Sequence, residues 1–92
     1  MPVTVRVPTQ LRSLTGGAGE VAVDASTAGE ALKAADTLHP GLAARLFDES
    51  GTLRRFVNVF VADEDIRFAS GLETPVREGQ TVSIVPAVAG GA

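Results

Sequence analysis

The chain has 92 residues, of which 45% are apolar and 21% are charged. This length suits one domain, and this composition suits a folded core rather than a disordered chain. The formal net charge is −3 and the basic residues are scattered, which argues against a protein that binds the phosphates of nucleic acid. Cysteine is absent, so disulfides, zinc–thiolate clusters and a cysteine nucleophile are excluded.

The hydropathy pattern gives no sign of a membrane protein. No apolar stretch reaches the length of about 18 residues that a membrane span needs. The segment Met-Pro-Val-Thr-Val-Arg at the N-terminus lacks the basic and apolar regions of a secretion signal. We therefore expect a soluble cytoplasmic protein that associates with neither membrane nor nucleic acid.

The first part of the chain predicts two strands. Valine occupies every second position of residues 3–7, and alternation returns at Val21 and Val23. A period of two is typical of a strand with one buried face. Residues 15–19 are rich in glycine and small side chains, which indicates a loop longer than a tight turn between the two strands of a hairpin.

A helix is predicted over residues 27–38. Thr27 is followed three residues later by Glu30, the capping-box pattern of a helix start. Pro40 and Gly41 end the helix. The apolar residues at helical spacing form one face that needs a sheet to cover it: Ala28, Ala31, Leu32, Ala35 and Leu38.

The remaining elements alternate between short strands and turns. A second helical turn is predicted near residues 42–47 and a polar loop at 48–52. The segment 56–61 reads as a central strand with its valines on one face. Residues 63–65 predict a turn, 66–68 a short strand, 78–79 another turn and 81–85 the last strand.

The resulting order of elements is β, β, α, β, β, β. Parallel pairing of the first and last strands requires a long crossover, and one helix across a mixed sheet buries the apolar face of that helix. The predicted fold class is therefore α+β, a β-grasp, formed by residues 1–86. Residues 87–92 would follow as a flexible tail that carries Gly90 and Gly91.

The tail Ala87-Val88-Ala89-Gly90-Gly91-Ala92 has no charge and no bulky side chain, and it follows Pro86. One interpretation is a frayed terminus or an addition foreign to the natural protein. The other is a functional segment, because a chain nearly free of side chains can enter a narrow enzyme channel and bring a carboxylate to ATP. Its place directly after the last strand of a predicted β-grasp favours the functional interpretation.

Three segments resemble a known family. Residues 82–91 are similar to the ending of the ubiquitin-like sulfur carriers of the MoaD and ThiS type, and residues 55–68 and 3–12 resemble the CysO branch, which serves cysteine synthesis. The resemblance implies that the Gly91 carboxylate is adenylated by an E1-like enzyme and converted to a thiocarboxylate. It also implies that the carrier catalyses nothing and binds no cofactor, because ATP is used by the activating enzyme.

The same resemblance implies three partners: an E1-like adenylyltransferase/sulfurtransferase, a cysteine synthase-type enzyme or another sulfur acceptor, and a metallopeptidase that releases the product. Two other functions stay open. One is sulfur donation to molybdopterin, thiamine or a secondary metabolite. The other is a ubiquitin-like modifier or interaction module joined to lysines through Gly91.

Ala92 departs from the family ending, which is Gly-Gly. With Ala92 attached, the carbonyl of Gly91 belongs to an amide and cannot be adenylated. Either a peptidase such as the metallopeptidase trims Ala92, or Ala92 is foreign to the natural protein.

A partner surface is expected on the sheet face opposite the helix. Alternation places Phe60 and Val85 there, and exposed apolar residues on a sheet often mark a docking surface. Arg55 and Arg67, with Arg54, would frame it. The alternative is that Phe60 and Val85 pack under the loop 48–52. His39 has no second imidazole or thiolate to accompany it, so no metal site is expected.

Overall fold

The computed structural model describes residues 2–86 of the chain. Seven strands and α-helices are joined by short 3₁₀ helices, η1 to η3. In chain order the elements are β1 (Pro2–Arg6), η1 (Thr9–Thr15), β2 (Glu20–Asp24), α1 (Ala28–Leu38), α2 (Leu42–Leu46), β3 (Val57–Val61), β4 (Glu64–Asp65), η2 (Ile66–Phe68), η3 (Gly71–Glu73) and β5 (Thr81–Pro86).

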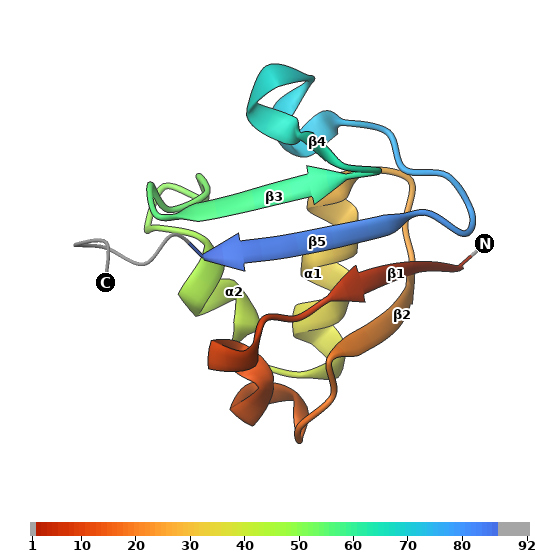
Figure 1. The fold of residues 1–92 in the computed structure, drawn as a ribbon. Helices are drawn as coiled ribbons and strands as arrows, with labels where there is room; N and C mark the ends of the chain where they lie inside the picture. Colours follow the sequence, from red (N-terminus) through yellow and green to blue (C-terminus); the bar gives the residue numbers. More distant parts are fainter. Residues whose placement is uncertain (1, 87–92) are drawn as a thin grey trace.

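The strands form one five-stranded mixed sheet in the order β2-β1-β5-β3-β4. The central pair, β1 and β5, is parallel, with Val5 opposite Val82, whereas β5 and β3 are antiparallel, with Ile84 opposite Val59. Helix α1 crosses behind the sheet in Figure 1 and leaves the other face toward the viewer. This arrangement confirms the predicted β-grasp.

The core lies between α1 and the sheet. Every second residue of the strands is buried there, and the predicted valine alternation is confirmed on β1, β2 and β3. Phe47, Leu11 and Leu14 pack against its margin. The most fully buried large side chains are aliphatic: Leu32, Leu42, Leu46, Ile66, Val3, Val5, Val7, Val59 and Val82.

Leu38 corrects the predicted apolar face of α1. Ala28, Ala31, Leu32 and Ala35 are fully buried, but Leu38 is 57% exposed. It lies at the side of the apolar stripe, in the last turn of the helix. There it lines a shallow cleft with Pro2 and Ala22 at the edge of the sheet instead of entering the core.

The predicted cap of α1 is confirmed, with one change of partner. The Glu30 N–H donates to Thr27 Oγ1 at 3.2 Å, while Glu30 Oε1 accepts from the N–H of Ser26 at 2.8 Å rather than from that of Thr27. At the far end, Asp36 Oδ1 accepts from the N–H groups of Gly41 and Ala43. Asp36 therefore supplies the cap that α2 lacks in its own N-cap residue.

The segment after β3 differs from the prediction. Residues 64–65 form β4, not a turn, and 66–68 form η2, not a strand. The tight turn lies one step earlier, at Ala62 (φ 51°) and Asp63 (φ 70°). The chain leaves the sheet after Asp65 because the carboxylate of Asp65 accepts from the N–H of Arg67 at 2.9 Å and caps η2.

The connection between β1 and β2 is also more ordered than a plain loop. It contains η1, and the buried hydroxyl of Thr15 hydrogen-bonds to the carbonyls of Arg12 and Ala18 at 3.1 and 2.7 Å. Strand β1 ends at Arg6, one residue before the predicted end, although Val7 is buried as expected.

We predict that Gly29→Ala destabilises the protein. A Cβ at position 29 would lie 3.0 Å from the carbonyl oxygen of Leu72 and 3.2 Å from its Cβ, so η3 would have to shift. Overpacking of this kind costs about 1–3 kcal/mol, more than the roughly 1 kcal/mol by which alanine favours a helix over glycine. Thermal or chemical unfolding measures the difference, with the exposed Lys33→Ala on the same helix as the control. A Gly29→Ala protein more stable than the parent would show that η3 yields freely.

Candidate functional site

The chain leaves the sheet at Pro86, the last residue of β5, which pairs with Val57 at the start of β3. The predicted tail residues lie outside the described residues: Ala87, Val88, Ala89, Gly90, Gly91 and Ala92. What the structure shows is the surface from which that tail departs. In the parallel pair, the end of β5 lies at the same end of the sheet as the end of β1.

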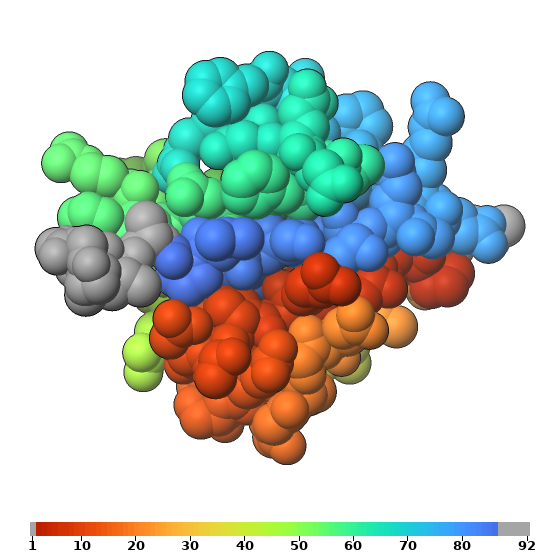
Figure 2. All heavy atoms as spheres, in the orientation of Figure 1, coloured from red at the N-terminus to blue at the C-terminus, as the bar shows by residue number. Residues whose placement is uncertain are grey.

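A groove on the outer sheet face, opposite α1, leads to this point. We call it the outer groove. Figure 2 looks onto this face, where β5 (blue) runs as a band between the β3–β4 segment (green) and the β1–η1 segment (red). The residues that line the outer groove include Arg6, Pro8, Arg12, Phe60, Val85 and Pro86.

Phe60 and Val85 lie on this outer face, as predicted. Phe60 pairs with Ser83, and Val85 pairs with Asn58, so both alternate with core residues. Phe60 is half-buried and Val85 is 44% exposed. None of the described residues lining the outer groove belongs to the loop 48–52, the alternative packing partner. Their role in binding a partner stays a prediction.

The two predicted framing arginines differ from each other. Arg67 donates from Nη1 to Asn58 Oδ1 and from Nη2 to the carbonyl of Arg54 at 3.1 Å. Arg55 is exposed and makes no hydrogen bond or ion pair with any residue of 2–86. Neither lines the outer groove itself. Arg67 is therefore hydrogen-bonded within the domain, whereas the Arg55 guanidinium has no such partner among residues 2–86.

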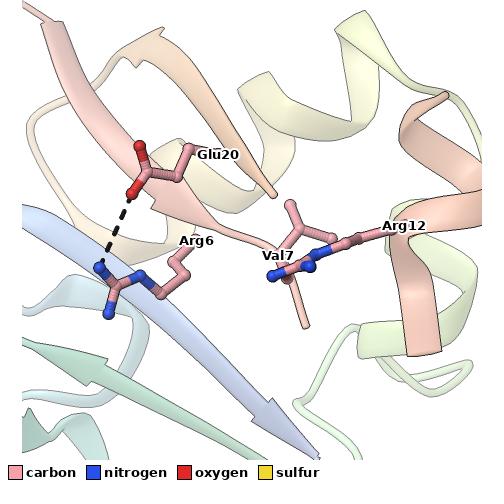
Figure 3. Close-up of polar contacts among 4 residues, drawn as sticks. All are labelled: Arg6, Val7, Arg12 and Glu20. Atoms are coloured by element: carbon pink, nitrogen blue, oxygen red, sulfur yellow. Dashed lines mark hydrogen bonds and ion pairs between the residues drawn. The ribbon is translucent and has the colours of Figure 1, made fainter. Parts of the chain in front are cut away.

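Two other arginines line the outer groove and were not singled out in the sequence (Figure 3). Arg6 lies 3.7 Å from Glu20, but both side chains are 61% exposed, so this ion pair contributes little to stability. Arg12 Nε donates to the carbonyl of Val7 at 3.1 Å. Alternation with Val5 and Val7 could have placed Arg6 on this face. The position of Arg12 depends on η1, and the sequence pattern did not predict that helix.

The described part of the chain offers no centre for metal chemistry. Among residues 2–86, no group of three or more histidine, cysteine, aspartate or glutamate side chains is placed to hold a metal ion. Within the same residues, no helix is long and apolar enough to cross a membrane. The arrangement is suited to contact: a groove lined by both apolar and polar residues, with two arginines along it, that reaches Pro86.

Helix α1 across a five-stranded mixed sheet, with the parallel strands β1 and β5 next to each other, defines a small ubiquitin-like protein. The sequence matches the ThiS family over residues 5–91. This chain belongs to the ThiS family.

Three related proteins show what the chain resembles. It is 46% identical to the sulfur carrier protein CysO of Mycobacterium tuberculosis over 93 residues, which cover 99% of this chain and 100% of that protein. A crystal structure of the BexX/CysO complex of Amycolatopsis orientalis matches with 48% identity and a TM-score of 0.90, covering 97% of this chain and 99% of the matched one. Small archaeal modifier protein 3 of Haloferax volcanii is 35% identical over 68 residues, 74% of this chain and 73% of that protein. Proteins of the ThiS and CysO type are small carriers, not catalysts.

We predict that Phe60→Asp and Val85→Asp leave the protein folded. Both side chains lie on the open face, so each substitution should lower the free energy of unfolding by at most about 2 kcal/mol. Val59→Asp is the matched control, because Val59 is fully buried on the other face of the same strand and a carboxylate there has no partner. Circular dichroism with chemical unfolding distinguishes them. Unfolding of the Phe60 or Val85 variant would make these residues part of the core.

Proposed function

We propose that this protein is a sulfur carrier that bears a thiocarboxylate on Gly91 and donates its sulfur in cysteine biosynthesis. The observation that carries the proposal is the alignment with CysO along nearly the whole chain. The family match also ends at Gly91, one residue before Ala92. Gly91 is thus the terminal residue of the region that the chain shares with its family.

The proposed chemistry takes place on partner enzymes. An oxygen of the Gly91 carboxylate attacks the α-phosphate of ATP, forming an acyl adenylate and releasing pyrophosphate. Sulfide then attacks the acyl carbon, displaces AMP and leaves a thiocarboxylate. On a cysteine synthase-type enzyme, its sulfur attacks the side-chain carbon of an activated serine and displaces the leaving group. The product is a thioester between the Gly91 acyl group and the cysteine sulfur. Transfer of the acyl group from that sulfur to the cysteine amine gives an amide, and hydrolysis of this amide by a metallopeptidase frees cysteine and restores the Gly91 carboxylate.

The distance available to the tail limits how the activating enzyme can bind. Gly91 lies five positions after Pro86, and five residue-to-residue steps span at most about 18 Å in any conformation. An enzyme that acts on Gly91 must therefore cover the end of the sheet at which β5 ends. The outer groove reaches that point, which supports Phe60 and Val85 as docking residues for the E1-like enzyme.

We predict that a chain ending at Gly91 gains sulfur when it is incubated with ATP, the activating enzyme and sulfide. Its mass should rise by the difference between one sulfur and one oxygen atom, as intact-protein mass spectrometry would show. The chain ending at Ala92 should not change, because its free carboxylate lies one residue past the reacting position and carries a methyl group beside it. A metallopeptidase that trims Ala92 should restore the reaction.

Gly91→Ala in the shortened chain is the matched variant for this experiment. It should lose most of the activation, since a Cβ enters the narrow channel, while its melting temperature should stay that of the parent. If the Gly91-ending chain gains no sulfur from an enzyme that activates CysO, the sulfur-carrier proposal is wrong.

A second prediction concerns the outer groove. Phe60→Asp and Val85→Asp should weaken binding to the activating enzyme by at least about tenfold, because a carboxylate in an apolar contact must be desolvated. Isothermal titration calorimetry of the folded variants measures this. Unchanged affinity in both would place the docking surface elsewhere on the domain.

One specific observation favours a second function. The similarity to small archaeal modifier protein 3 fits a modifier that is joined through Gly91 to lysines of other proteins. Both functions begin with the acyl adenylate and diverge at the nucleophile, which is sulfide in one and a lysine amine in the other. Loss of lysine conjugates in cells that carry Gly91→Ala would support the modifier function, and an unchanged sulfur supply in the same cells would count against the carrier function.

A further inference from the structure

A β-turn lies directly beside the point where the tail departs. The N–H of Val57 donates to the carbonyl of Arg54 at 3.0 Å, so Arg55 and Phe56 are the two central residues of this turn. Val57 is also the residue that pairs with Pro86. Arg55 and Phe56 therefore directly precede the residue that pairs with Pro86, the last residue before the tail. We call these two residues the exit turn.

The exit turn is held from two sides through Arg54. On one side, the Arg54 N–H donates to the carbonyl of Leu46 at 2.8 Å, and Arg54 Nη2 donates to that of Ala44 at 3.1 Å. Both acceptors belong to α2. On the other side, Arg67 of η2 donates to the Arg54 carbonyl at 3.1 Å. The turn is thus fixed between two elements rather than left as a free loop.

The two side chains of the exit turn contribute little to the fold. Phe56 is 53% exposed, and Arg55 has no hydrogen-bond or ion-pair partner among residues 2–86. A single exposed aromatic residue is ordinary. An arginine without a partner among the described residues, next to Phe56 on a turn held by hydrogen bonds where β5 ends, is less ordinary.

We infer that the exit turn is a recognition element for the activating enzyme, and that Arg67 is a positioning residue for it. This inference rests on the proposed function. The complementary site on the enzyme is a carboxylate next to an apolar pocket, at the mouth of the channel that receives the tail. Arginine and aromatic side chains are the usual anchors of such contacts, and a free guanidinium matches a carboxylate in charge and shape.

Charge makes this contact selective. The chain carries a net charge of −3, so an acidic enzyme surface would repel the molecule as a whole. The exit turn offers that surface a cation at the one place where the tail must enter. Recognition at this position should favour encounters with the tail facing the channel, and it should weaken as salt screens the charges.

The test compares charge reversal at two exposed arginines in the chain that ends at Gly91. Arg55→Glu alters the exit turn, whereas Arg77→Glu makes the same change in the turn before β5, at the opposite end of that strand. The rate of pyrophosphate release with the activating enzyme and ATP gives KM and kcat for the carrier at low and high salt.

We expect Arg55→Glu to raise KM about tenfold at low salt, with kcat nearly unchanged, because the lost contact acts on binding and not on the acyl transfer. The difference from the parent should shrink at high salt. Phe56→Ala should also raise KM, but equally at both salt concentrations. Arg77→Glu should match the parent. Equal KM values for the Arg55→Glu and Arg77→Glu chains would overturn the inference.

Arg67 is tested by a double-mutant cycle, because Arg67→Ala affects stability as well as the turn. In the parent, Arg67→Ala should raise KM several-fold. In a chain that already carries Arg55→Glu and Phe56→Ala, it should have almost no further effect, since the turn it positions no longer binds. A merely structural loss would be the same in both backgrounds, and that result would overturn the positioning role.

The parent chain separates failure of the inference from failure of the proposed function. If the Gly91-ending parent releases no pyrophosphate, the proposed function is wrong and the inference falls with it. If the parent is active and the two charge reversals behave alike, only the exit turn is wrong.

Discussion

The parallel pairing of β1 with β5 is the constraint on which the rest of the structure depends. Two parallel neighbours cannot be joined by a hairpin, so a long stretch of chain must connect β1 to β5. That stretch contains β2, which forms a hairpin with β1, and then α1, β3 and β4. The same pairing brings both strands to an end on one side of the molecule. The base of the tail, the start of η1 and the outer groove share that side for this reason.

The sequence predicted the elements in which a local pattern and the tertiary environment agree. The alternating valines of β1, β2 and β3 and the Thr27 cap of α1 were predicted correctly. A strand with one buried face requires an apolar residue at every second position, and an unpaired N–H at a helix start favours a capping side chain, so both features can be recognised in the sequence. Residues 64–68 were assigned wrongly. A two-residue strand has no period to detect, and the capping contact of Asp65 depends on the sheet already being formed.

The residues of the candidate site also fall into those that the sequence could predict and those that it could not. The tail was predicted from its composition, its position after the last strand and its family resemblance, and it lies outside the residues that the structure describes. The position of Phe60 and Val85 on the outer sheet face followed from the alternation of side chains along a strand. The different roles of Arg54, Arg55 and Arg67 could not be predicted, because they depend on contacts between α2, η2 and the start of β3, which are separated along the chain.

The distribution of phenylalanine has a practical consequence. The chain contains four phenylalanines and neither tryptophan nor tyrosine. Phe56 and Phe68 are exposed, at 53% and 85%, and Phe60 lines the outer groove, whereas Phe47 packs against the core. Fluorine labels on these rings would therefore provide three reporters on the surface and one against the core, in a spectrum of only four resonances. The chain carries, by its composition, a simple probe set for observing which face a partner covers.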